Sequence, residues 1–159
     1  SVRQMFSTDP DYLIKLMVAR RMIETEVLGI LTAPEGRMTD EVEQALERMR
    51  RCRDERDFTG FTEADAAFHL ALVHSAGNEI PSVFYENLYG LITDVIRITS
   101  RVPSKSLEDA YAEHAAIYAR IQNRDEPGAK ALLRAQIDNS AAYLRVAIEK
   151  ANLKENNDA

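Results

Sequence analysis

Residues 61–77 read FTEADAAFHLALVHSAG, and the fold is inferred outward from this stretch. Asp65 and His69 are four residues apart, so on a helix their side chains lie on one face, one turn apart. The same face carries a stripe of apolar side chains: Phe61, Phe68, Leu72 and Ala76. A carboxylate and an imidazole within a buried stripe need a partner, and a metal ion or a bound acid would supply one. The stretch therefore predicts a helix that carries a polar site into a protein core.

The composition is that of one globular, helix-rich domain. Of 159 residues, 45% are hydrophobic and 29% charged, with only 6 Gly and 5 Pro. The net charge of -6 argues against direct binding of nucleic acid, because an acidic surface repels phosphate. No apolar run approaches the roughly 20 residues that cross a membrane. No signal-peptide pattern opens the sequence, so we expect a cytoplasmic protein.

Capping and breaking residues divide the chain into helices. Asp9-Pro10-Asp11 predicts the first helix start and Ala33–Gly36 its end; Thr39, Thr62, Ser106 and Asp125 predict further starts. Residues 57–60 are expected to form a break, and Gly77 to end the helix of Asp65. Another helix is expected from about residue 80 to Pro103. Their inner faces are expected to include Ile30 and Phe84. No alternating, strand-like pattern occurs, so the chain is predicted to be all-α.

Three further polar residues fall on predicted inner faces. Arg20 interrupts the apolar stripe of the first helix, and either reaches out to solvent or is held inside by an anion. His114 and Gln136 lie on the inner faces of the two last helices. Helical bundles commonly build ligand and metal sites from such facing side chains, although one histidine on an apolar face is usually a core residue. His74 is five residues after His69 and should point elsewhere.

In this order the residues resemble a known family. Arg20–Glu24, the Asp65-x-x-x-His69 pair, Gly77-Asn78 and Glu113-His114 are similar to the FCD domain of GntR-type, FadR-like bacterial transcription regulators. The resemblance spans residues 9–152 and implies an antiparallel bundle of six to seven helices around a ligand cavity. Residues 1–8 would then be the remnant of a linker, and residues 153–159 a frayed tail.

The resemblance also implies a metal site. Metal-binding members hold a divalent ion with one aspartate and three histidines, which correspond to Asp65, His69, His114 and, at the last position, Gln136. Glutamine offers only a neutral amide oxygen, so the fourth position is weak or lost. Zinc, nickel or manganese binding by the remaining three ligands is expected, but a metal-free site is the alternative.

The implied function is regulatory and not enzymatic. A small carboxylate effector would bind Arg20, with Asn78 and Arg97 as lesser candidates, and would change how a homodimer holds DNA. The DNA-binding winged helix is expected in an N-terminal domain outside this chain. Two alternatives stay open: a metal-free dimerisation or acyl-ligand module, and, less favoured, a metal-dependent hydrolase whose proton relay would need Glu24 or Glu113.

Overall fold

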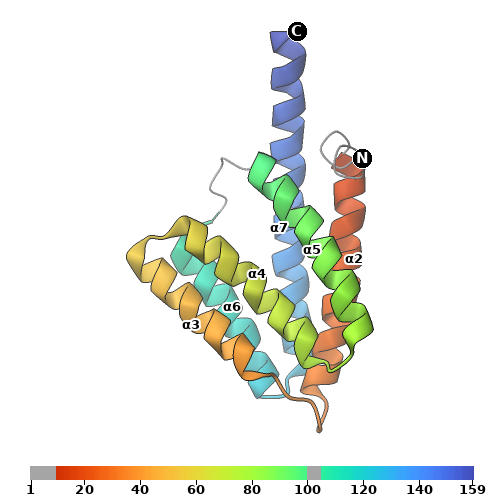
Figure 1. Cartoon of the computed structure of the whole chain (residues 1–159), viewed down its shortest axis with the longest axis vertical. Coiled ribbons are helices and arrows are strands. Elements are labelled where there is room, and N and C mark those ends of the chain that lie inside the picture. Colours follow the sequence, from red (N-terminus) through yellow and green to blue (C-terminus); the bar gives the residue numbers. More distant parts are fainter. Residues whose placement is uncertain (1–9, 100–104) are drawn as a thin grey trace.

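The computed structural model describes residues 10–99 and 105–159, and this part of the chain is entirely helical apart from its connections (Figure 1). The expected lead-in at residues 1–8, the Asp9 cap and Pro103 lie outside it. Its six helices are α2 Pro10–Thr32, α3 Asp40–Glu55, α4 Phe58–Ser75, α5 Glu79–Thr99, α6 Leu107–Gln122 and α7 Glu126–Asp158. The predicted all-α bundle is therefore confirmed. No helix in these two ranges is long and apolar enough to cross a membrane.

The helices form two packed groups that share one core. Helices α2, α5 and α7 contact one another, and α3 packs against both α4 and α6. Helix α4 joins the groups through α2 and α5, and α6 joins them through α2 and α7. Figure 1 shows α2 and α7 side by side and running in opposite directions. The polar face of α4 therefore lies where the two groups meet.

Two helices, α4 and α7, begin with the same capping hydrogen bond, from a glycine N–H to an aspartate three residues before it. The Asp57 carboxylate accepts a hydrogen bond from Gly60 N at 2.9 Å, and Asp125 accepts one from Gly128 N at 3.0 Å. A Cβ on either glycine would lie 2.2–2.3 Å from the capping carboxylate, so the Asp-x-x-Gly spacing needs glycine. Ser106 caps α6 as predicted, through a 3.1 Å bond from Asp109 N.

One predicted helix start was wrong, and another was right in position but lacks the expected capping bond. Helix α4 begins at Phe58 and not after Thr62, because Asp57 already caps it across the expected break. Thr39 precedes α3 but makes no side-chain bond to that helix; its hydroxyl lies 3.2 Å from Ser75 Oγ at the end of α4. Gly77 ends α4 as expected, with a positive φ of 74°.

Helix α7 also differs from expectation at its end. Residues 153–158 are helical and exposed, where a frayed tail was expected. Leu153, Lys154 and Glu155 favour a helix, but Asn156, Asn157 and Asp158 do not, so helix propensity alone does not explain this extension.

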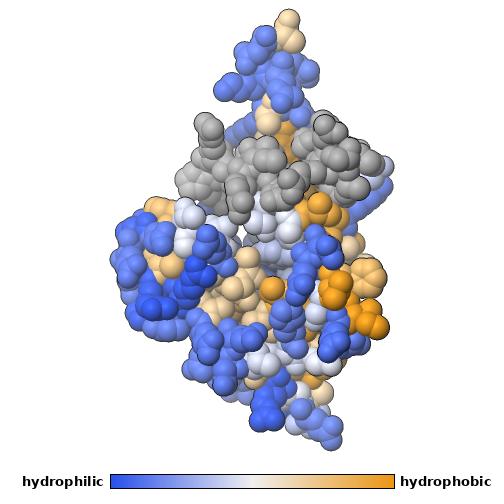
Figure 2. All heavy atoms as spheres, in the orientation of Figure 1, coloured by the Kyte–Doolittle hydropathy of each residue, from blue (hydrophilic) through white to orange (hydrophobic). Residues whose placement is uncertain are grey.

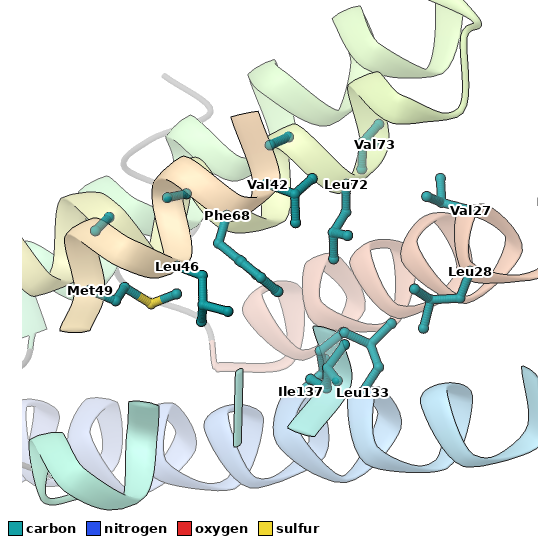
Figure 3. Close-up of a cluster of buried hydrophobic side chains, with 14 of the residues drawn as sticks. Val27, Leu28, Val42, Leu46, Met49, Phe68, Leu72, Val73, Leu133 and Ile137 are labelled. Atoms are coloured by element: carbon teal, nitrogen blue, oxygen red, sulfur yellow. The ribbon is translucent and has the colours of Figure 1, made fainter. Parts of the chain in front are cut away.

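A single apolar core occupies the space between the groups (Figure 3). Its fully buried members include Leu28 on α2, Phe68 and Leu72 on α4, and Leu133 on α7. Ile30 and Phe84 were expected inside, but are 44% and 68% exposed. Their neighbours Leu28 and Tyr85 take the buried positions instead: both are 0% exposed.

Adjacent leucines on α7 test this core. Leu133→Ala should lower the free energy of unfolding by about 2–5 kcal/mol, because Leu133 is fully buried and truncation leaves a cavity. Leu132→Ala is the matched control, since Leu132 is 37% exposed and should cost clearly less. Urea unfolding measures both. Equal losses would mean that α7 has a different rotation about its axis.

Candidate functional site

A cavity of about 350 Å³ lies between the helices. Arg20 of α2, Asp65 and His69 of α4, His114 of α6 and Gln136 of α7 all line it, together with Tyr89 of α5. The structure therefore brings together five of the seven predicted site residues from four helices. The volume is in the range of small-molecule sites, at its lower end.

Three of these residues form a compact cluster of metal-ligating type. The ligand atoms of Asp65, His69 and His114 lie within 4.8 Å of one another. One carboxylate oxygen, Asp65 Oδ1, is 2.8 Å from His114 Nε2 and 3.3 Å from His69 Nε2. Both histidines are almost fully buried, whereas the side chain of Asp65 is 35% exposed. The cluster thus opens on one side only.

A backbone carbonyl orients His114. Its Nδ1–H donates to Ala110 O, one helical turn earlier, at 2.7 Å. Nδ1 therefore carries a proton, and Nε2 faces Asp65. Since the carboxylate is an acceptor too, a second proton or a cation between Nε2 and Asp65 would make this contact favourable.

A buried carboxylate orients His69. Glu24 Oε1 contacts His69 Nδ1, and Glu24 Oε2 accepts a 2.6 Å hydrogen bond from Arg20 Nε. Glu24 and His69 are each 1% exposed and Arg20 is 5% exposed. Three ionisable groups in the core are tolerated because each is paired with the next.

The charges of this cluster reinforce one another. Burial opposes the charge on Glu24, but His69 and Arg20 outweigh it and lower the pKa of Glu24 to about 2. Burial likewise opposes the charge on His69, but Glu24 and Asp65 raise its pKa above the usual value. Burial also opposes the charge on Asp65, but His114 and His69 outweigh it and hold the pKa of Asp65 well below its usual range. Both carboxylates are therefore ionised at neutral pH.

Aromatic rings fix these side chains from the apolar side. Phe68 meets the rings of His69 and His114 edge-on, at centroid distances of 5.6 Å and 5.2 Å. Tyr89 lies nearly parallel to His69 at 6.3 Å and under the Arg20 guanidinium at 5.1 Å. The polar groups consequently point toward the cavity and not into the core.

Gln136 is only partly satisfied. Its amide nitrogen lies 3.2 Å from His114 Nε2 and 3.4 Å from His114 Nδ1. Its oxygen Oε1 is buried and makes no hydrogen bond within the described residues. A buried acceptor without a donor is costly, so a cation or a ligand donor beside it would be stabilising.

The other predicted residues lie elsewhere. Asn78 does not line the cavity: its Oδ1 accepts a hydrogen bond from Ile80 N and so caps α5. The side chain of Arg97 lies outside the described part of the structure. His74 points away as predicted, and contacts Glu86 at 2.9 Å.

Sequence reasoning undervalued three site residues. Glu24 was considered only as a proton relay, although its place four residues after Arg20 on the same face could have revealed the pairing. Tyr89 and Lys105 line the cavity without a spacing signal. Lys105 lies just before α6 and pairs with Glu113 at the cavity wall, a contact that helical spacing does not indicate.

The pKa of Glu24 gives a pH-dependent test on metal-free protein. Its folded pKa of about 2 lies below the unfolded value of 4.5, so its stabilisation is complete above pH 4.5 and lost as the pH falls toward 2. Glu24→Gln should lower the free energy of unfolding most above pH 4.5. Its difference in that free energy from wild type should shrink by about 3 kcal/mol toward pH 2. Urea unfolding at several pH values measures this. Glu47→Gln is the exposed control: Arg50 also lowers the pKa of Glu47, but solvent screens that pair, so the trend should be much smaller. A constant difference between Glu24→Gln and wild type would contradict the pairing.

Comparisons with solved structures agree with the fold described above. The metal-free FCD domain of TM0439, described as a transcriptional regulator, superimposes with a TM-score of 0.72 at 19% identity, covering 89% of this chain and 97% of that one. McbR/YncC from E. coli gives a TM-score of 0.70 at 16% identity, covering 86% of this chain and 66% of that one. At these identities the likeness shows the fold. No curated protein matches the chain.

The family itself is identified by sequence. The family model described as the FCD domain matches residues 15–139, which include the cavity residues from Arg20 to Gln136. This match confirms the resemblance to the FCD domain inferred from the motifs. The chain therefore belongs to the FCD domain family.

Proposed function

We propose that this chain is the effector-sensing and dimerisation domain of a GntR-type, FadR-like transcription regulator, and that its effector is a small organic acid. One observation carries the proposal: a buried arginine faces the same 350 Å³ cavity as the Asp65/His69/His114 cluster. Membership of a family of regulatory domains supports a sensor and not an enzyme.

Arg20 is the proposed carboxylate-binding residue. Within the described residues it donates a hydrogen bond through Nε alone, to Glu24. Its two terminal nitrogens are left for a ligand, and they form the edge that binds a carboxylate with two parallel hydrogen bonds. Tyr89 supports the guanidinium from one side. The arginine is therefore held in place before the acid arrives, which lowers the entropic cost of binding.

The residues present fit a divalent metal. Asp65, His69 and His114 would hold it, as a two-histidine, one-carboxylate set that suits zinc, nickel or manganese. Gln136, whose buried Oε1 needs a partner, would be a weak fourth ligand. A metal bound there would add positive charge beside Arg20 and offer an open position to the acid.

A metal-free sensor is the second candidate. Asp65 and His114 already pair at 2.8 Å, so two protonated histidines could satisfy the carboxylate without a metal. In that case the acid would bind Arg20 and the protonated cluster directly. The cavity volume, near the lower limit for ligand sites, disfavours a large acyl-type effector in either case.

Exposed apolar side chains support a homodimer. Ile80, Val83 and Phe84 near the start of α5 are 68%, 56% and 68% exposed, and Met22 on the neighbouring α2 is 66% exposed. Figure 2 shows hydrophobic atoms gathered on the α5 side of the molecule. Such a patch is typical of a protein–protein contact. A second copy of the chain is the proposed partner.

Regulation would be allosteric. The acid would change the packing of cavity-lining helices α2 and α7, and with it the spacing of two DNA-binding domains. Those domains would precede this chain, with residues 1–8 as linker, 9–152 as the sensor domain and 153–159 as its tail, of which residues 153–158 continue the last helix. A protein that controls transcription in this way would act in the bacterial cytoplasm.

The metal site has a direct test. Asp65→Ala and His114→Ala should each abolish the rise in Tm on adding Zn²⁺ or Ni²⁺, because each removes one of three ligands. Gln136→His should strengthen metal binding by supplying a fourth imidazole. His74→Ala, a histidine outside the cluster, is the control and should keep the wild-type response. Elemental analysis gives the stoichiometry. An unchanged response in the two alanine variants would exclude this site.

Acid binding has its own test. Arg20→Lys should weaken binding of lactate or pyruvate by about 10- to 100-fold, since a lysine keeps the charge but loses the paired hydrogen bonds. Metal affinity should change far less. Arg21→Lys is the control, because the exposed Arg21 pairs with Asp138 outside the cavity. Titration calorimetry measures both ligands; equal losses of acid and metal in Arg20→Lys would remove its proposed role.

A further inference from the structure

One buried carboxylate serves two hydrogen-bond donors on opposite sides. Glu24 Oε2 accepts from Arg20 Nε at 2.6 Å, and Glu24 Oε1 contacts His69 Nδ1. An arginine Nε always carries a proton, so the atom opposite it must be an acceptor. A carboxylate offers an acceptor at both oxygens, and the contact to His69 is therefore satisfied only by an N–H at Nδ1.

The other nitrogen of His69 is consequently the free one. His69 Nε2 points toward Asp65 Oδ1 at 3.3 Å, the longer of the two contacts of this ring. Asp65 is closer to His114, at 2.8 Å, and is partly exposed. It is therefore a weaker acceptor for a proton on His69 Nε2 than Glu24 is for a proton on His69 Nδ1. When His69 holds one proton, that proton lies on Nδ1.

We infer that Arg20 and Glu24 act together as positioning residues that fix the tautomer of His69, so that its Nε2 lone pair is presented to the Asp65/His114 cluster. The inference rests on the proposed metal site for its consequence, because only an unprotonated Nε2 can ligate a metal. It gives Arg20 a second role besides acid binding: it holds the Glu24 carboxylate against His69, and it would decide which end of an amide at position 24 faces His69.

Glutamine at position 24 would reverse the tautomer. Its amide has one acceptor and one donor end, and Arg20 Nε–H requires the acceptor. The NH₂ end then faces His69 Nδ1, which can only accept, so the proton moves to Nε2. Glutamine has nearly the same shape and volume as glutamate. His69 would therefore stop being a metal ligand because its Nε2 becomes protonated, and not because any atom is missing.

His114 supplies an internal control. Its Nδ1–H donates to the backbone carbonyl of Ala110, which no side-chain substitution at position 24 alters. A variant that merely loosened the fold would disturb both histidines, whereas a tautomer effect is confined to His69.

Two measurements test the inference. On ¹⁵N-histidine-labelled, metal-free protein at alkaline pH, two-bond ¹H–¹⁵N correlations report which nitrogen is protonated. Wild type should show Nδ1–H at both His69 and His114, and Glu24→Gln should show Nε2–H at His69 alone. Zn²⁺ affinity, measured by competition with a chelator, should fall about 10- to 100-fold in Glu24→Gln.

Removing Arg20 as well should restore binding. In Arg20→Met/Glu24→Gln the amide is free to turn its oxygen to His69, and no buried charge is left unpaired. Zn²⁺ affinity should return to within about threefold of wild type, and His69 to Nδ1–H. This double variant also keeps the test decisive should Glu24→Gln alone fold poorly.

The failures are distinguishable. Wild-type Zn²⁺ affinity in Glu24→Gln, an unchanged His69 tautomer, or no rescue in the double variant would overturn the inference while leaving the metal site standing. Absence of Zn²⁺ binding in wild type would instead refute the metal site, and the tautomer would still be decided by the NMR measurement.

Discussion

The carboxylate of Glu24 is the contact on which the site depends. It is buried at the meeting point of α2 and α4, and it neutralises Arg20 with one oxygen while it contacts His69 with the other. Without it, an arginine and an imidazole would face each other in an apolar core, at a cost of several kcal/mol. One acidic side chain thus lets the fold hold the proposed acid-binding group, Arg20, beside the proposed metal ligand, His69.

The formal charges of the site bear on the proposed binding of an acid. The ionisable groups at the cavity and directly behind it are three carboxylates and two permanent cations: Glu24, Asp65 and Glu113 against Arg20 and Lys105. Taken alone, these groups repel an acid. Protons on the two histidines, or a divalent metal among them, reverse the sign of the local charge. The proposed acid binding would therefore be coupled by electrostatics to the protonation or metal occupancy of the histidine cluster.

Much of the fold and of the site was predictable from local chemistry. Apolar spacing and caps such as Asp125 and Ser106 locate the helices, because these signals act within one or two turns. The i, i+4 pair Asp65/His69 places both residues on one face for the same reason. Long-range packing was not predictable: whether Leu28 or Ile30 turns inward depends on α7, and the pairing of Lys105 with Glu113 depends on how the chain enters α6. Glu24 was predictable in part. Its pairing with Arg20 follows from local spacing, but its second partner, His69, is 45 residues away in the sequence.

The length of α7 has a mechanical consequence. Ser140 lines the cavity, and the same helix continues to Asp158, which at the α-helical rise is a further distance of about 27 Å. Figure 1 shows this end of α7 projecting on the side of the molecule where α2 begins. A rigid rod pivoting at the cavity acts as a lever: a tilt of about 5° there displaces its tip by about 2 Å. Small rearrangements around a bound acid would thus be magnified at the end where α2 begins.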